Sequence, residues 1–168
     1  FSPLSSTFHC YRNFTTVLTI RNAMDVLTII IVDFPLLSQF HHRTHHPYSV
    51  LVPIVMEAEA TPFVEHLELK PVEDFFPSYT PFLAFTGKHS NTQVTVITMG
   101  KDSIYETGVD NVGTVPASLA TFLAVEKLKT TDGDDDAVDL ILNGGTCGGF
   151  QRMGGSIGDV YLTSGVVN

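Results

Sequence analysis

Cysteine is scarce in this sequence. Cys10 and Cys147 are far apart, and Cys147 stands among glycines. Two such residues do not form the disulfide framework of a small secreted domain. We therefore expect a protein of a reducing compartment, the cytoplasm.

Positive charge is also scarce. Nine Lys and Arg residues face eighteen Asp and Glu residues, which gives a net charge of −9. Nucleic acids and anionic membranes bind to basic surfaces, so we expect neither as a partner. A small ligand in a neutral pocket is compatible with this charge. With 43% hydrophobic and 16% charged residues, the 168-residue chain has the composition of a globular domain with a sizeable core.

A long uninterrupted hydrophobic run is missing as well. The most apolar segment, residues 15–37, is interrupted by Arg21, Asp25 and Asp33. Its longest clean stretch, residues 26–32, is much shorter than the roughly 20 residues of a membrane-spanning helix. It also lacks the positive start and small-residue cleavage site of a signal peptide. We interpret residues 1–48 as an atypical leader or a misannotated segment, and the apolar segment within it as a buried strand or part of a misannotated leader.

The tract HHRTHHP at residues 41–47 raises the question of a metal site. Histidines four residues apart, such as His41 and His45, can share a helix face and bind zinc. No nearby cysteine or carboxylate completes such a site, and Pro47 favours extended backbone at His46. We interpret the tract as an exposed polar linker, with a metal site as the less favoured alternative.

Regular patterning begins at Ser49. The run SVLVPIV predicts a buried strand over residues 49–55, in which Pro53 indicates an edge position or a bulge. Residues 56–69 are typical of a helix. Its first helical position is either Pro62, with Thr61 as the cap, or an earlier residue.

The remaining segments continue the alternation of strands and helices. We expect a hairpin over residues 83–99 and a helix over residues 113–129 with Pro116 in its first turn. The other expected elements are a loop at 73–82, an acidic loop at 130–137, and strands at 138–143 and 158–167. This order predicts an α/β fold: a mixed central sheet flanked by helices.

A glycine-rich loop, NGGTCGGF, follows the strand expected at residues 138–143. Its spacing is neither the dinucleotide-binding G-x-G-x-x-G nor a P-loop. Ligands of α/β sheets bind at the carboxyl ends of strands, and glycine lets the backbone approach a ligand closely. The loop is therefore a candidate ligand-binding loop, with a tight turn as the alternative. Glu57 and Glu59 follow the strand expected at residues 49–55. A carboxylate there can accept a proton from a bound water, although surface glutamates are common.

Three separated blocks carry a resemblance to a known family: VPIVMEAEATPFVEHLEL, GVDNVGTVPASLATFLAVEKLK and DLILNGGTCGGF…GGSIGDVYL. In this order they resemble the plant 5′-methylthioadenosine nucleosidases of the nucleoside phosphorylase family. The resemblance covers residues 49–168, which we interpret as the N-terminal part of a nucleosidase domain. Residues 1–48 show no such resemblance.

The resemblance implies hydrolysis of an N-glycosidic bond. Water displaces adenine from 5′-methylthioadenosine and leaves 5-methylthioribose, a step of methionine salvage. S-adenosylhomocysteine is a second possible substrate. The family implies a nucleoside phosphorylase-like fold, a homodimer when full length, and no metal or organic cofactor.

The resemblance also implies roles for individual residues. Glu59, three positions after Met56, corresponds to the carboxylate that holds the attacking water. Glu57 occupies a position that varies in the family and receives no catalytic role. Substrate contacts are implied for five residues: Met56, Val109, Thr146, Cys147 and Gly148.

The chain starts without Met and stops within an apolar run, so we interpret it as a fragment or an incomplete gene model. The family's purine-protonating Asp, its ribose-binding Met-Glu pair and its purine-facing aromatic belong to the second half of the domain. We therefore expect these 168 residues alone to be inactive and the intact parent to be a nucleosidase.

Three alternatives stay open. A phosphorylase would hold phosphate with arginines and a glycine-rich turn, whereas Arg152 is the single arginine after Ser49. Lys101 could bind an anion but lacks a cluster of basic partners in the sequence. A non-enzymatic relative of the vegetative storage type would need no intact site, but it usually carries a secretory signal. The third alternative is a truncated pseudo-enzyme.

Overall fold

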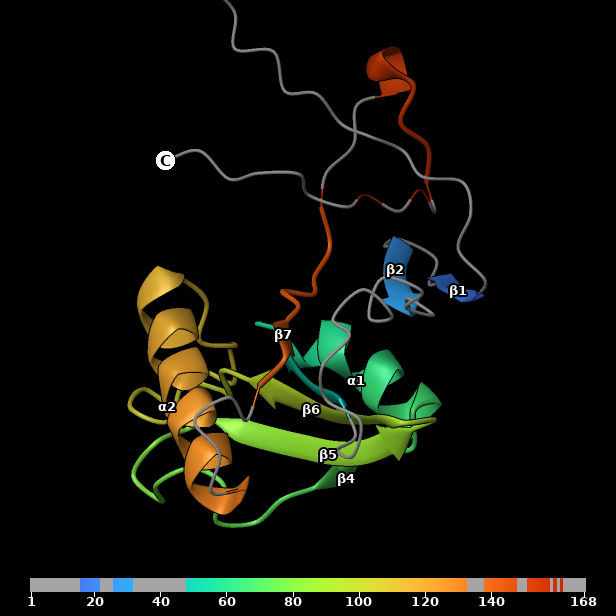
Figure 1. Cartoon of the computed structure of the whole chain (residues 1–168). Coiled ribbons are helices and arrows are strands. Elements are labelled where there is room, and N and C mark those ends of the chain that lie inside the picture. Colours follow the sequence, from blue (N-terminus) through green and yellow to red (C-terminus); the bar gives the residue numbers. More distant parts are fainter. Residues whose placement is uncertain are drawn as a thin grey trace, which may run out of the picture. The chain divides into compact units, whose positions relative to one another are not determined.

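The computed structural model describes residues 16–21, 26–31, 48–132, 138–147, 151–157, 159 and 161 (Figure 1). The chain divides into two compact units. The α/β unit comprises residues 42–145, and the terminal unit comprises residues 1–41 and 146–168. The histidine-rich tract at residues 41–47 lies outside the described residues.

The α/β unit contains a five-stranded mixed sheet in the order β4-β5-β6-β3-β7 (Figure 1). Its strands are β3 (Tyr48–Pro53), β4 (Lys70–Pro71), β5 (Leu83–His89), β6 (Thr92–Thr98) and β7 (Leu140–Ile141). The strand β3 pairs in parallel with both β6 and β7, whereas β4, β5 and β6 pair antiparallel. The expected mixed central sheet with helices is confirmed.

The position of Pro53 differs from the prediction. Because β3 has a neighbour on each side, Pro53 lies at the end of a central strand and not at an edge. Its carbonyl accepts the Gly144 N–H at 3.0 Å, so its ring nitrogen faces β7 as well. The named ladder of β7 ends at Ile141, and the missing donor of proline is tolerated there.

The expected hairpin is confirmed. Strands β5 and β6 pair from Leu83 opposite Thr98 to His89 opposite Thr92. The turn contains Ser90, whose φ of 53° lies in the left-handed region. The short strand β4 was not predicted, because two residues that include a proline carry no strand pattern.

Helix α1 spans Glu57–His66. The alternative of an early start is confirmed, and Pro62 lies inside the helix instead of at its first position. The predicted end at residue 69 was wrong. Glu68 adopts a φ of 52°, which ends the helix, and the Leu69 N–H bonds to the Val64 carbonyl at 2.9 Å.

Helix α2 spans Thr114–Asp132, with Pro116 in its first turn as expected. It continues beyond the predicted end into the segment assigned to an acidic loop, of which residues 133–137 lie outside the described residues. Ala120 and Ala124 are fully buried and pack in one hydrophobic cluster with side chains of the sheet, among them Leu51, Ile97 and Met99. The small alanines let the helix approach the sheet closely.

The terminal unit contains strands β1 (Thr16–Arg21) and β2 (Val26–Ile31), which pair antiparallel. Strand structure in the apolar segment 15–37 is thus confirmed, as two strands. A 3-10 turn, η2, spans Gln151–Met153. Of the strand expected at residues 158–167, only positions 159 and 161 are described, and neither is in a strand. No helix in the described part of the chain has the length and hydropathy to cross a membrane.

Candidate functional site

The three parallel strands of the α/β unit end at one edge of the sheet. Strand β3 leads to Met56 and helix α1, β6 leads to the loop at residues 100–113, and β7 leads to Gly144. The carboxyl edge of parallel strands is where α/β proteins bind ligands. The segments that contain Glu59, Val109 and the glycine-rich loop therefore all follow strands that end at this edge.

Glu59 lies in the first turn of α1. Met56, which precedes the helix in an extended conformation, accepts hydrogen bonds from the N–H groups of Glu59 and Ala60 at 3.1 and 3.0 Å. Ala60 is buried and sets the inner side of this turn, while Glu59 is half-buried. Met56 is 36% exposed. The Glu59 carboxylate thus lies near the carboxyl edge of the sheet and is partly accessible, while Ala60 on the same turn is buried.

The start of the glycine loop reaches this carboxylate. Gly144 lies against β3, and a Cβ at its position would be only 3.2 Å from the Ile54 side chain. A Cβ at the next residue, Gly145, would lie 3.6 Å from Oε2 and 3.9 Å from Oε1 of Glu59. The glycine loop and Glu59 are therefore direct neighbours at Gly145.

The other predicted substrate contacts differ in how far the structure describes them. Val109 is 61% exposed in the loop at residues 100–113, and its carbonyl accepts the Asp102 N–H at 2.8 Å. Thr146 and Cys147 follow Gly145 in sequence, are exposed, and belong to the terminal unit. Gly148 lies outside the described residues.

The loop at residues 100–113 is organised by Asp102, a residue that was not among the predicted site residues. Its carboxylate accepts the N–H groups of Ile104 at 3.0 Å, Tyr105 at 3.2 Å and Thr107 at 3.4 Å, and the Thr107 hydroxyl at 2.9 Å. The Tyr105 N–H and the Thr107 hydroxyl are the main causes that hold the pKa of Asp102 below its ordinary value. The sequence feature that could have indicated this role is an aspartate at the start of a polar loop, where Asp side chains commonly accept hydrogen bonds from nearby backbone N–H groups.

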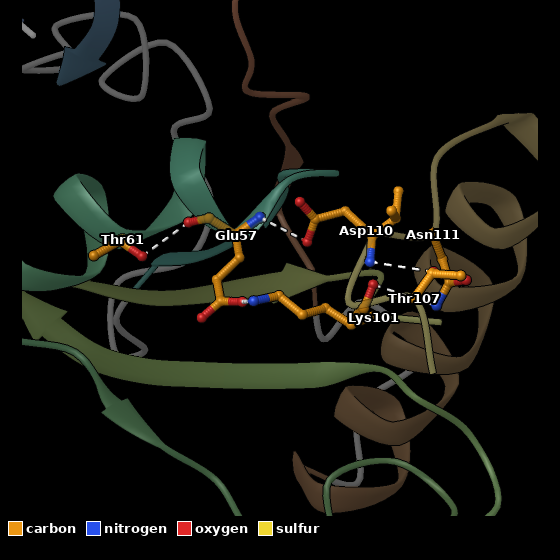
Figure 2. A network of polar contacts seen from close by, with 8 residues as sticks. Glu57, Thr61, Lys101, Thr107, Asp110 and Asn111 are labelled. Carbon is orange, nitrogen blue, oxygen red and sulfur yellow. Dashed lines mark hydrogen bonds and ion pairs between the residues drawn. The ribbon is translucent and has the colours of Figure 1, made fainter. Parts of the chain in front are cut away.

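Glu57 links helix α1 to this loop (Figure 2). Its carboxylate Oε2 lies 2.7 Å from Lys101 Nζ, and its backbone N–H donates to Asp110 Oδ1 at 3.3 Å. The hydrogen bond and charge of Glu57 raise the pKa of Lys101. Lys101 was considered as an anion-binding residue, but it has a carboxylate partner. This network could not be predicted from the sequence, because Glu57 is far from Lys101 and Asp110 along the chain.

A half-buried carboxylate beside glycine backbone can hold a water molecule and accept its proton. The described residues contain no cluster of three or more His, Cys, Asp or Glu side chains that could bind a metal ion. The half-buried Glu59 carboxylate beside Gly145 is suited to acid–base chemistry.

Comparison with known proteins identifies relatives of this chain. The phosphorylase superfamily matches residues 50–168. A 5′-methylthioadenosine nucleosidase of Arabidopsis thaliana is 41% identical over 120 residues, which cover 71% of this chain and 41% of that protein. A 5′-methylthioadenosine/S-adenosylhomocysteine nucleosidase of the same plant is 38% identical over 122 residues, which cover 71% of this chain and 44% of that protein. The chain thus spans about two fifths of the length of these relatives.

Solved structures give the same result. The apo structure of the Arabidopsis thaliana 5′-methylthioadenosine nucleosidase aligns with a TM-score of 0.58 at 37% identity, over 68% of this chain and 43% of that one. An MTA/SAH nucleosidase structure aligns with a TM-score of 0.56 at 31% identity, over 67% and 42% of the two chains. The sequence match and the shared fold together show that the chain belongs to the phosphorylase superfamily, in which it resembles nucleosidases.

Proposed function

We propose that the protein carrying this chain hydrolyses the N-glycosidic bond of 5′-methylthioadenosine to adenine and 5-methylthioribose. The observation that carries the proposal is the position of the Glu59 carboxylate beside Gly145, at the carboxyl edge of the parallel strands. The names of the Arabidopsis relatives supply the substrate class. Since one of them is named for both nucleosides, S-adenosylhomocysteine is a second substrate to test.

The chemistry matches a carboxylate at this place. When the bond from ribose C1′ to adenine N9 breaks, its electron pair goes to adenine, and adenine takes up a proton. The ribose carbon becomes cation-like, and a water oxygen forms the new bond to it. Glu59 would hold that water and take its proton, as a general base does in inverting glycosidases. Val109, Met56, Thr146, Cys147 and Gly148 would contact the nucleoside.

The phosphorylase alternative is less favoured. Phosphate would need a cationic site at the same edge, and Lys101 is paired with Glu57 at 2.7 Å. Its charge is therefore already balanced by a carboxylate. Adenine release that does not depend on added phosphate would separate hydrolysis from phosphorolysis.

Finer aspects of this proposal concern the setting of the enzyme. We propose that residues 49–168 belong to the nucleosidase domain and that residues 1–48 do not contribute to catalysis. The protein would act as a cytoplasmic homodimer in methionine salvage. The low cysteine content supports the compartment, and exposed apolar side chains on α2 support the dimer.

A chimaera tests the activity. Residues 49–168 replace the aligned segment of the Arabidopsis nucleosidase, and adenine release from 5′-methylthioadenosine is measured by chromatography with and without phosphate. The 168-residue chain, expected to be inactive alone, is assayed beside it. We expect phosphate-independent turnover by the chimaera and a loss of about 10²-fold or more in Glu59→Gln, because the water loses its base.

The matched control is Glu65→Gln, which makes the same change at an exposed position of the same helix. It should keep the turnover of the unsubstituted chimaera. An inactive chimaera that is folded, or a Glu59→Gln variant with full activity, would contradict the proposed function.

A further inference from the structure

The N-terminus of helix α1 is capped by a distant residue. Met56 makes no side-chain capping hydrogen bond. The first helical N–H, that of Glu57, instead donates to Asp110 Oδ1, 53 residues along the chain. The first N–H groups of a helix have no partner within it, and a carboxylate also opposes the positive end of the helix dipole. Asp110 meets both needs.

Lys101 makes a second link to the same helical residue. Its ammonium lies 2.7 Å from Glu57 Oε2, and its backbone forms an antiparallel bridge with Asp110. Asp110 therefore binds the backbone amide of Glu57, and Lys101 binds its carboxylate. Figure 2 shows Glu57 at the start of helix α1, with Lys101 and Asp110 both directed to it.

The bridge is braced at its base by Asn111. The Asn111 side-chain amide donates to the carbonyls of Met99 and Gly100 at 3.2 and 3.3 Å, and its backbone N–H donates to Gly100 at 2.9 Å. Met99 is fully buried directly after β6. The two residues that hold Glu57 are thus anchored to the central sheet and not to a loose loop.

We propose that Lys101 and Asp110 are positioning residues, which fix the first turn of α1 and thereby hold the Glu59 carboxylate at Gly145. This inference rests on the proposed function, because it gives Glu59 a reaction to serve. Both residues act on Glu57, two positions before Glu59 on the same turn of α1. A shift of about 1 Å in a catalytic group can cost ~10²-fold in rate.

A simple surface ion pair predicts something different. Both charged side chains of the Lys101–Glu57 pair are about half exposed, and exposed pairs contribute little to stability. If the contacts served stability alone, removing them would lower the Tm slightly, and the kcat of the folded protein would not change. Positioning predicts a drop in kcat that is much larger than the change in Tm or KM.

The test uses the active chimaera with Asp110→Ala, Asp110→Asn and Lys101→Ala. We expect kcat to fall about tenfold in Asp110→Ala and Lys101→Ala, with KM changed less than about threefold. Asp110→Asn keeps an acceptor oxygen for the Glu57 N–H and should recover most of the lost rate. Glu126→Ala is the matched control, since it breaks the exposed Lys129–Glu126 pair of α2. It should leave kcat and KM unchanged.

A second measurement does not depend on turnover. Amide hydrogen exchange in the full chain should accelerate at Glu57 and its neighbours in Asp110→Ala but not in Glu126→Ala. If the unsubstituted chimaera is inactive, the proposed function fails and exchange alone decides whether Asp110 caps α1. Unchanged exchange in Asp110→Ala overturns the inference. Unchanged kcat in folded Asp110→Ala and Lys101→Ala chimaeras, with an active parent, also overturns it.

Discussion

At the scale of single residues, the neighbour of Glu59 has no side chain. A Cβ at position 145 would lie 3.6 Å from Glu59 Oε2, an ordinary contact distance. Alanine can therefore replace Gly145 without displacing the carboxylate. Any larger side chain would compete with Glu59, or with the water it is proposed to hold, for the same space.

This spacing yields a prediction for two substitutions in the chimaera. Gly145→Ala should keep turnover within about threefold of the parent, whereas Gly145→Val should lower kcat by ~10-fold or more, because its branched methyl groups push against the carboxylate. Adenine release under saturating substrate measures the effect, and Gly145→Ala is the matched control. Equal rates in the two variants would show that Glu59 does not work at this contact.

Sequence neighbours carry part of the information about the proposed site. The role proposed for Glu59 comes from its spacing to Met56 in a block that resembles a family, and it stays a prediction. Its contact with Gly145 required both residues to end at one edge of a sheet, and the order of parallel strands makes that expectation possible. The capping of α1 by Asp110 was not predictable, since no local pattern pairs residues 53 positions apart.

At the scale of elements, the loop at residues 100–113 has a pH-dependent anchor. Hydrogen bonds to Asp102 lower its pKa below the ordinary value of 3.8. The charged form therefore stabilises the folded loop above that value. This stabilisation is lost as the pH falls through the lower pKa of the folded state.

Asp102→Asn tests this anchor. We expect the variant to melt at a lower temperature than the parent chimaera at neutral pH, because the neutral amide binds the four donors less strongly. The difference in Tm should shrink as the pH falls from 3.8 through the lower pKa of the folded state, where the parent carboxylate also becomes neutral. Asp74→Asn, an exposed aspartate with a positive φ, is the control. A Tm difference that stays constant across this pH range would contradict the prediction.

Helices and strands were predicted where apolar patterning is strong, and their ends were predicted less well. Strand β3, the β5–β6 hairpin and helix α2 follow runs that bury residues such as Leu51, Val96 and Ala124. Pro53 indicated an edge or a bulge because proline lacks a backbone donor, but the strand pattern alone does not show that β3 pairs on both sides. Helix α2 continues to Asp132 because the acidic composition that marks a loop does not itself stop a helix.

At the scale of the whole molecule, one face of α2 is apolar and exposed. Val115 is 77% exposed, Leu119 48% and Phe122 62%, and with Thr114 and Ser118 they line a shallow depression. Their spacing of three and four residues forms one stripe along the helix. Exposed apolar stripes of this kind are typical of protein–protein contacts, so this face supports the proposed homodimer.

The dimer proposal predicts a change of mass in solution. The chimaera, which has the length of the full domain, should sediment as a dimer at micromolar concentration, and the double substitution Leu119→Ser with Phe122→Ser should weaken its dimerisation at least tenfold, since buried aromatic anchors dominate interfaces. Both side chains lie on the outer face of α2, so the variant should keep its helical circular dichroism. Tyr79→Ser, which removes an exposed aromatic of the loop at residues 73–82, should leave the dimer intact.

The result also separates two roles for the α2 face. A parent that is monomeric at every concentration would exclude a second copy as its occupant. The apolar stripe would then have to pack against sequence of the kind present in the longer relatives, of which this chain covers about two fifths. In that case the same double substitution should destabilise the chimaera, which carries the rest of the Arabidopsis domain, while leaving the Tm of the 168-residue chain unchanged.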